Sequence, residues 1–227
     1  MLLFGGDRWG LSCLFSERYD VVAREVRGYC LDVGCGPHNR FVNRYLNGCG
    51  RGVDVFLYDG LTTDHLLRDA TRFPFADASF ETATFNANFN HIPPALRDPE
   101  IAEAYRVLKP GGNVVVTMGN PAAEIVVHQL LWLYDRVLGT RFDLDNIRGR
   151  QPGETHYVGD REIIACLRQQ RFTGLKKKYF WTQWGLNHLF VAWKRADASG
   201  RDPDGDDAAS VDPPIRDDEA ARKEPRR

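Results

Sequence analysis

The chain has 227 residues, of which 43% are hydrophobic and 27% are charged, and this balance suits one folded domain with a substantial buried core. Its formal net charge of −1 leaves no basic excess, so we do not expect a nucleic-acid partner. No apolar run approaches the roughly 18 residues of a membrane-spanning helix, and residues 1–10 do not resemble a secretory leader. We therefore expect a cytoplasmic protein.

The cysteines and the end of the chain set further limits. Five cysteines are scattered without a CxxC pair or a histidine at zinc-ligand spacing, so we interpret them as reduced thiols and expect no metal site. Residues 195–227 are rich in Asp, Ala, Arg and Pro and contain no aromatic residue, which predicts a disordered, charged tail. We expect residues 1–194 to form the single domain.

Short β-rich segments alternate with helical patterns, as in βαβ units. The predicted fold is α/β: a Rossmann-like, doubly wound, mostly parallel sheet of seven strands, with one antiparallel strand near the edge and helices on both faces. The expected strands are residues 29–33, 52–55, 65–68, 80–85, 113–118, 175–181 and 189–193.

Three helices are predicted between these strands. The first covers residues 41–46, which place apolar side chains on one helical face. The second begins with Asp98 as N-cap and Pro99 in its first turn, and residues 110–112 stop it. The third is capped by Asp160.

A glycine loop follows the first strand. The strand ends in Asp32 and runs into Gly34-Cys35-Gly36, where the missing Cβ atoms let a ligand approach the backbone. A dinucleotide fingerprint would require a third glycine at Asn39, which disfavours a nicotinamide cofactor. Asp54 ends the second strand about 20 residues later, the spacing at which a carboxylate accepts ribose hydroxyls. The pattern predicts a nucleoside ligand.

Four motifs then occur in a fixed order: LDVGCGP, GVD, DATRFPFADASFE and YRVLKPGG. In order and spacing they resemble the type 11 group of class I S-adenosylmethionine-dependent methyltransferases, from residue 27 to residue 120. The resemblance implies S-adenosylmethionine as cofactor and S-adenosylhomocysteine as product. The aromatic residues Trp132, Tyr134 and Phe142, before the helix at Asp160, favour a small or lipophilic acceptor of the methyl group over a large polymer. Two positions depart from the family pattern, because His38 replaces a third glycine and Glu81 replaces an aspartate.

The resemblance also implies roles for single residues. Asp32 and the glycine loop would surround the methionine part of the donor, Asp54 would bind the ribose, and Asp69 would accept from the adenine amine. The implied cofactor-binding residues are Asp32, Gly34, Cys35, Gly36, Asp54, Asp69, Ala70 and Asn86. Two local alternatives stay open: Asp69 as a cap of the turn before Phe73, and Asp54 as a solvated strand end.

The acceptor side is expected in a long connection. About 40 residues separate the fifth strand from the helix at Asp160, far more than an ordinary loop, and we interpret residues 119–159 as a lid. Residues 1–26 would form a helical cap over the same opening. Candidate general bases, needed for a hydroxyl or an acidic carbon acceptor, are His156, His91 and Tyr157.

Two other functions stay open at this stage. One is a noncatalytic methyltransferase-like module that binds the cofactor and a protein partner, and the other is a nicotinamide-dependent oxidoreductase. No pattern in the chain indicates an oligomeric state.

Overall fold

The computed structural model describes residues 14–119, 136, 158–180 and 187–196, all within the first of two compact units, Met1–Asp197. The predicted tail, most of the predicted lid and the start of the N-terminal cap therefore lie outside the described residues. Within the described ranges, no helix is long enough and apolar enough to cross a membrane.

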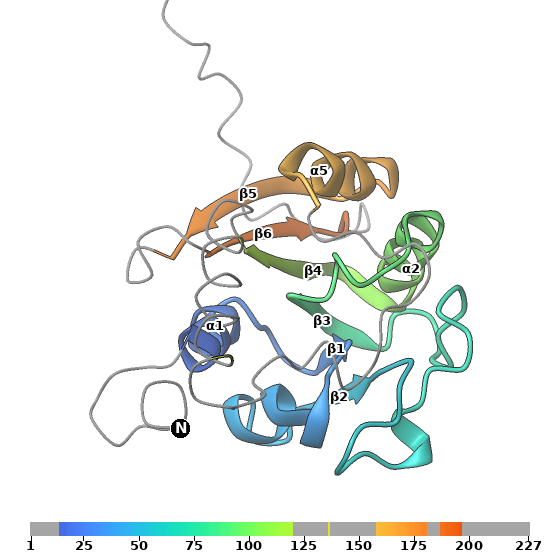
Figure 1. Cartoon of the computed structure of the whole chain (residues 1–227). Helices are drawn as coiled ribbons and strands as arrows, with labels where there is room; N and C mark the ends of the chain where they lie inside the picture. The colour runs from blue at the N-terminus through green and yellow to red at the C-terminus, as the bar shows by residue number, and fades with distance from the viewer. Residues whose placement is uncertain (1–13, 120–135, 137–157, 181–186, 197–227) are drawn as a thin grey trace, which may run out of the picture. The chain divides into compact units, whose positions relative to one another are not determined.

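A six-stranded sheet with the order β2-β1-β3-β4-β6-β5 forms the centre of the described structure (Figure 1). Strands β2, β1, β3 and β4 are parallel, and β6 is antiparallel to both of its neighbours. The predicted mixed α/β sheet is thus confirmed. The strands are β1 Cys30–Val33, β2 Gly50–Val53, β3 Phe80–Asn86, β4 Leu108–Gly119, β5 Thr173–Tyr179 and β6 Asn187–Trp193.

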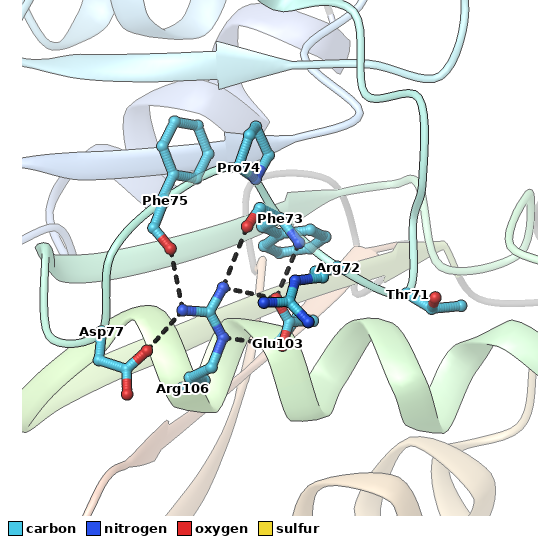
Figure 2. A pocket seen from close by; sticks show the side chains of 8 residues that line it. All are labelled: Thr71, Arg72, Phe73, Pro74, Phe75, Asp77, Glu103 and Arg106. Carbon is cyan, nitrogen blue, oxygen red and sulfur yellow. Dashed lines mark hydrogen bonds and ion pairs between the residues drawn. The ribbon is translucent and has the colours of Figure 1, made fainter.

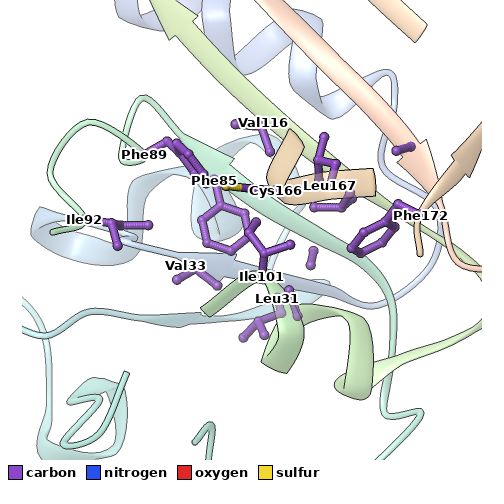
Figure 3. Packing of buried hydrophobic residues seen from close by; sticks show 14 of the residues in the cluster. Leu31, Val33, Phe85, Phe89, Ile92, Ile101, Val116, Cys166, Leu167 and Phe172 are labelled. Carbon is purple, nitrogen blue, oxygen red and sulfur yellow. The ribbon is translucent and has the colours of Figure 1, made fainter. Parts of the chain in front are cut away.

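Alternate residues of each buried strand point to opposite faces of the sheet, so apolar side chains lie on both faces. Helices cover both of these faces. Val114 and Val116 pack with α2 (Pro94–Val107) and α5 (Asp160–Gln169), whereas Val115 packs with α1 (Leu14–Ala23) and η2 (Phe41–Tyr45). Figure 3 shows the α2 and α5 side, where Phe85, Ile101 and Leu167 are almost fully buried. Burial of each such side chain contributes about 2 to 3 kcal/mol.

The short connections place the ends of the parallel strands at one edge. Because β1, β3 and β4 run in the same direction, the loops after Val33, Asn86 and Gly119 all leave the same edge of the sheet. We call this the carboxyl edge. Two 3-10 turns, η1 (Pro37–Asn39) and η3 (Thr63–His65), follow β1 and β2.

The expected strand at residues 65–68 is not formed, so the count of seven strands is not confirmed. Leu66 makes one parallel bridge to Asp54, held by hydrogen bonds from Asp54 N to His65 O (2.8 Å) and from Leu67 N to Asp54 O (2.7 Å). The preceding turn η3 uses residues up to His65, and Asp69 begins another turn. The apolar run between them is therefore too short for a strand.

Two predicted helix starts need correction. The second helix begins at Pro94, with Pro93 as its N-cap, so Asp98 and Pro99 lie inside it. A proline at the first helical position has a preset φ and no N–H that needs a partner, and this favours the earlier start. The third helix does begin at Asp160, but Gly159 is its N-cap, and the Asp160 carboxylate contacts other strands instead.

Candidate functional site

The glycine loop is folded across the end of β2. The N–H groups of Gly34 and Cys35 both donate to Val53 O, at 2.8 and 3.1 Å. Gly34 has φ +75°, and a Cβ there would come within 2.3 Å of the Asn88 side chain. Gly36 has φ +62°, and no described atom would lie within 4 Å of a Cβ added to it. The loop thus needs glycine at both positions, and its backbone is open at Gly36.

Asp54 joins this loop to the one after β2. Its side chain is 6% exposed, Oδ2 accepts from Gly36 N at 3.0 Å, and Oδ1 accepts from Phe56 N at 3.0 Å. These two bonds hold the carboxylate between the glycine loop and the loop after β2. The alternative of a solvated strand end is therefore wrong, because the carboxylate is buried and bonded.

Asp32 is a buried carboxylate behind the loop. Its Oδ1 accepts from Thr84 Oγ1 at 2.7 Å and from Asn86 Nδ2 at 2.8 Å, and the residue is 1% exposed. Burial raises the pKa of Asp32 to about 7, against the lowering effect of the two hydrogen bonds, and the nearby Asp54 raises it further. The charged form lacks a cation among these contacts.

Asn86 ends β3 beside Asp32 and leaves one polar atom unsatisfied. Its Nδ2 donates to Asp32, while its Oδ1 is buried and has no hydrogen-bond partner among the residues that the structure describes. Buried polar atoms are normally bonded. An acceptor atom of this kind at the carboxyl edge suits a ligand that brings a hydrogen-bond donor.

Asp69 and Ala70 follow the bridge at Leu66. The Asp69 side chain is exposed, and its Oδ1 accepts from Thr71 N (2.8 Å) and Thr71 Oγ1 (2.6 Å), which lowers the pKa of the carboxyl. This is the local turn that the sequence left as an alternative. Ala70 packs against the core. A role of either residue toward a ligand stays a prediction.

The loop after Asp54 exposes an apolar run that the sequence analysis did not single out. Val55, Phe56 and Leu57 are 51%, 39% and 45% exposed, and the Phe56 ring lies 4.8 Å from the Tyr58 ring. The signal was present, because three apolar residues directly follow an acidic strand end. Exposed apolar groups beside a buried carboxylate suit a flat ligand with both polar and apolar parts.

The three predicted bases divide into one described and two undescribed residues. His91 lies in the turn after β3, where its backbone N–H donates to Asn88 O at 2.9 Å. Asn90 Nδ2 lies 3.4 Å from the ring nitrogen Nε2 of His91. His156 and Tyr157 lie outside the described residues.

Two further buried titratable groups were missed by the sequence analysis. Glu100 on α2 is 4% exposed, and burial, with a smaller effect of Asp54, raises its pKa to about 8. His188 on β6 is 4% exposed, and Asp160 Oδ1 lies 2.9 Å from its Nε2. Both positions were hidden because polar residues on an apolar helix face or strand end give no periodic signal.

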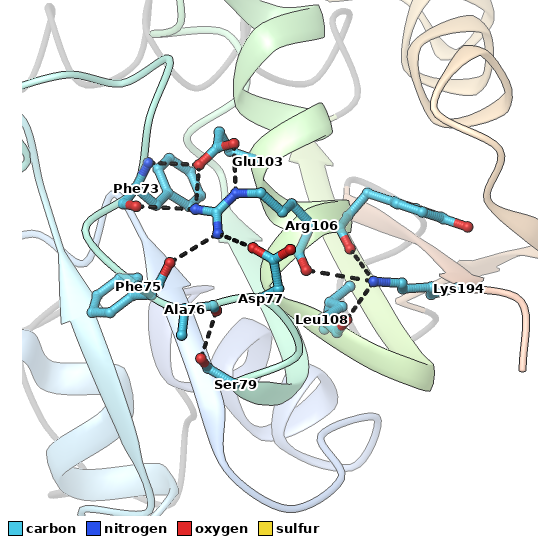
Figure 4. A network of polar contacts seen from close by, with 10 residues as sticks. Phe73, Phe75, Ala76, Asp77, Ser79, Glu103, Arg106, Leu108 and Lys194 are labelled. Atoms are coloured by element: carbon cyan, nitrogen blue, oxygen red, sulfur yellow. Dashed lines mark hydrogen bonds and ion pairs between the residues drawn. The ribbon is translucent and has the colours of Figure 1, made fainter. Parts of the chain in front are cut away.

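The motif residues of the 71–79 loop and of α2 form a hub away from the carboxyl edge. Arg106 donates to Phe73 O, Phe75 O and Asp77, and it pairs with Glu103, whose Oε2 accepts from Phe73 N at 2.8 Å (Figure 4). The hub therefore gives a structural role to residues 73–77 of the DATRFPFADASFE motif and to Arg106 of the YRVLKPGG motif. Glu81, which replaces an aspartate of the family pattern, has a structural role too, because its carboxylate accepts from Tyr29 N and pairs with Lys109.

A hollow of about 450 Å³ lies over this hub and belongs to the opposite edge (Figure 2). The 71–79 loop leads into the first residue of β3, and Arg106 is near the end of α2, just before β4. The hollow is lined by Thr71, Arg72, Phe73, Pro74, Phe75, Asp77, Glu103 and Arg106. Asp77, Glu103 and Arg106 are engaged with one another, and the hollow lies away from the glycine loop, so we do not regard it as the ligand site.

In the described ranges, no group of three or more His, Cys, Asp or Glu side chains could hold a metal ion. Cys30, Cys35, Cys49 and Cys166 are free thiols.

Comparison with known proteins gives the family of this arrangement. A model described as "Methyltransferase domain" matches residues 31–116. Over these residues the chain is similar to the methyltransferase domain family. The matched segment contains β2, β3, α2 and most of β1 and β4, and with them the glycine loop, Asp54 and Asn86.

Relatives of the methyltransferase domain are found among quinone-biosynthesis enzymes. The ubiquinone/menaquinone biosynthesis C-methyltransferase UbiE of Desulfotalea psychrophila is 35% identical over 115 residues, which are 48% of this chain and 46% of that protein. The mitochondrial 2-methoxy-6-polyprenyl-1,4-benzoquinol methylase of Drosophila melanogaster is 35% identical over 88 residues, 34% of this chain and 27% of that protein. The chain thus spans less than half the length of these relatives.

Solved structures share the fold at low identity. A SAM-dependent methyltransferase of Thermotoga maritima, titled a possible histamine N-methyltransferase, has a TM-score of 0.55 and 16% identity, covering 80% of this chain and 89% of that one. A 1,6-didemethyltoxoflavin-N1-methyltransferase of Burkholderia thailandensis has a TM-score of 0.51 and 16% identity, covering 80% and 77%. These likenesses concern the fold alone.

Proposed function

We propose that the chain is an S-adenosylmethionine-dependent methyltransferase that acts on a small, lipophilic acceptor. The observation that carries the proposal is the glycine loop between two carboxylates: Gly36 is open, Asp54 is bonded to it, and Asp32 is buried behind it. S-adenosylmethionine supplies a methyl group that is already activated on a sulfonium, and S-adenosylhomocysteine is the product.

The residues of the site match the polar and apolar parts of this cofactor. Asp54 lies at the strand end and spacing where a carboxylate accepts ribose hydroxyls, and Asn86 Oδ1, unsatisfied among the described residues, is an acceptor for an ammonium group. An ammonium near Asp32 would favour its charged form. The exposed Val55 and Phe56 offer an apolar surface to a purine ring.

The remaining predicted residues take their roles within the same proposal. Gly34 and Cys35 would line the methionine part, because their N–H groups fix the loop on Val53 O. Asp69 and Ala70 would hold the adenine, since the Leu66 bridge brings their loop next to Asp54. The chain's own contribution to the reaction is alignment of the acceptor with the methyl carbon, and proximity supplies most of the acceleration.

The acceptor proposal uses the names of the relatives. UbiE of Desulfotalea psychrophila is named a C-methyltransferase of ubiquinone and menaquinone biosynthesis, and the Drosophila relative is named a benzoquinol methylase. The 119–159 segment contains the aromatic residues Trp132, Tyr134, Phe142 and Tyr157. We therefore propose an aromatic hydroxyl compound of the quinol type, with His91, His156 and Tyr157 as candidate bases.

The predicted domain plan belongs to this proposal as well. Residues 1–194 would form the methyltransferase domain, with residues 1–26 as cap and 119–159 as lid, and residues 195–227 would be a separate charged tail. A cytoplasmic location is proposed on the scattered, unpaired cysteines.

A transfer assay tests the function. The protein is incubated with isotope-labelled S-adenosylmethionine and either a reduced short-chain 1,4-benzoquinol or a metabolite extract, and labelled products are read by mass spectrometry. We expect protein-dependent labelling of a small molecule. Donor binding without any labelled product would favour the noncatalytic module, and binding of a nicotinamide dinucleotide alone would overturn the proposal.

A further inference from the structure

His188 and Asp160 meet at the carboxyl edge, on the face of the sheet that α5 covers. His188 is the second residue of β6, and its register partner is Met118, next to the end of β4. Asn86 at the end of β3 pairs with Thr117, so His188 lies one residue further toward the carboxyl edge than Asn86. Strand β6 is two strands from β3, about 10 Å at ordinary strand spacing.

The His188 ring is held from several sides. Its side chain is 5% exposed, the Phe190 ring is edge-on at 5.3 Å, and the Tyr179 ring is 5.9 Å away. Asp160 Oδ1 lies 2.9 Å from Nε2 without an aligned hydrogen bond, and Asp160 Oδ2 pairs with Lys177. The other ring nitrogen, Nδ1, makes no hydrogen bond among the described residues.

This arrangement differs from a simple ion pair that fastens α5 to β5. Lys177 and Asp160 alone would supply such a link, and Lys177 additionally lies 4.5 Å from the Tyr179 ring. His188 adds a titratable nitrogen at the edge where the proposed acceptor would bind. A carboxylate on one nitrogen and an unbonded second nitrogen form the arrangement by which histidine accepts protons.

We propose that His188, oriented by Asp160, takes the proton that the acceptor loses during methyl transfer. The inference rests on the proposed function and assigns its general base, with Asp160 as a positioning residue. The acceptor gives one proton to Nδ1 and forms one bond to the methyl carbon, while the carbon–sulfur bond breaks and its electron pair stays on sulfur. His188 then returns the proton to water.

The charges around His188 agree with this role. Burial lowers the pKa of His188, the Asp160 carboxylate opposes that effect, and the Lys177 ammonium adds to it. The ring is therefore neutral at pH 7 and able to accept a proton. Within the part of the chain that the structure describes, Tyr179 is the remaining titratable group in contact with the ring.

Turnover of the reduced 1,4-benzoquinol, at saturating donor and acceptor, tests the inference. His188→Gln should reduce kcat about 100-fold or more, the usual effect of a general base, while the donor dissociation constant stays within twofold. Lys176→Gln is the matched control on the neighbouring strand β5, because Lys176 is exposed and its ammonium lies over the Trp193 ring, and it should keep the wild-type rate. Unchanged kcat in His188→Gln would overturn the inference.

The pH profile gives a second test that does not depend on His188→Gln folding. The acid limb of kcat should move to lower pH in Asp160→Asn and to higher pH in Lys177→Gln. Asp32 also titrates near neutrality, but a limb due to Asp32 would stay in place in both variants, and that result would refute the role of His188. A wild-type protein that methylates no probe would instead refute the proposed function itself.

Discussion

Replacement of Asp32 by asparagine should stabilise the protein in the absence of cofactor, although Asp32 lies in the proposed site. An asparagine Oδ1 can still accept from Thr84 and Asn86, so the substitution removes the buried charge and keeps both hydrogen bonds. The wild-type carboxyl has its pKa raised from 3.8 to about 7. The folded state therefore binds more protons than the unfolded chain between these values, and wild-type stability falls as the pH rises through them.

The size of the effect follows from that pKa difference. One pKa unit corresponds to about 1.4 kcal/mol, so ionisation of Asp32 destabilises the fold by about 1.5 kcal/mol at pH 5 and about 4 kcal/mol at pH 8. The advantage of Asp32→Asn over wild type should grow by this difference. The destabilisation of about 4 kcal/mol at pH 8 corresponds to a gain in Tm of about 10 °C for Asp32→Asn over wild type.

Urea unfolding followed by tryptophan fluorescence at pH 5, 6, 7 and 8 measures the effect. Asp64→Asn serves as the control, because Asp64 is exposed, and its difference from wild type should be small at every pH. A stability difference between Asp32→Asn and wild type that is constant from pH 5 to pH 8 would refute the raised pKa and the cost of this buried charge.

Three further substitutions test the loop, the site and the hub. His38→Gly should stabilise the protein by about 1 kcal/mol in urea unfolding, because His38 has φ +61°; a loss of stability would contradict this. Asp54→Asn should weaken S-adenosylmethionine binding at least about 10-fold by calorimetry, since a charged acceptor is lost. Arg106→Met should cost about 3 kcal/mol of stability through its lost backbone bonds, yet leave the donor dissociation constant of the folded protein unchanged; weaker binding would place the hub in the site.

Parts of the fold followed from the sequence where a strand is an apolar run next to glycine or proline, as in β1 and β4. The β-branched segment around Val114 to Val116 predicts β4, and the glycine loop fixes the end of β1. The strand predicted at residues 65–68 is not formed because the turns on either side limit the length of this apolar run. The apolar pattern does not reveal these turns. The prediction of the α2 start was wrong because the sequence offers two starts that contain proline, one at Pro94 and one at Pro99.

The site was predictable where one residue type meets one local geometry, and not where a partner comes from a distant strand. Gly34 and Asp54 could be placed from spacing alone. Thr84 meets Asp32 through the register of β3 on β1, and Asp160 meets His188 through the packing of α5 on the sheet. Asp69 shows the limit most clearly, because a carboxylate in a loop can serve its own turn, as it does with Thr71.

The central claim is that the glycine loop and Asp54 form a site for S-adenosylmethionine, and calorimetry tests it most directly. Wild-type protein is titrated with S-adenosylmethionine, with S-adenosylhomocysteine and with a nicotinamide dinucleotide, and Asp54→Asn is titrated in parallel. The account predicts that wild type binds the first two and not the third, and that Asp54→Asn weakens both. Binding of the nicotinamide dinucleotide without S-adenosylmethionine, or equal affinity in Asp54→Asn, would contradict it.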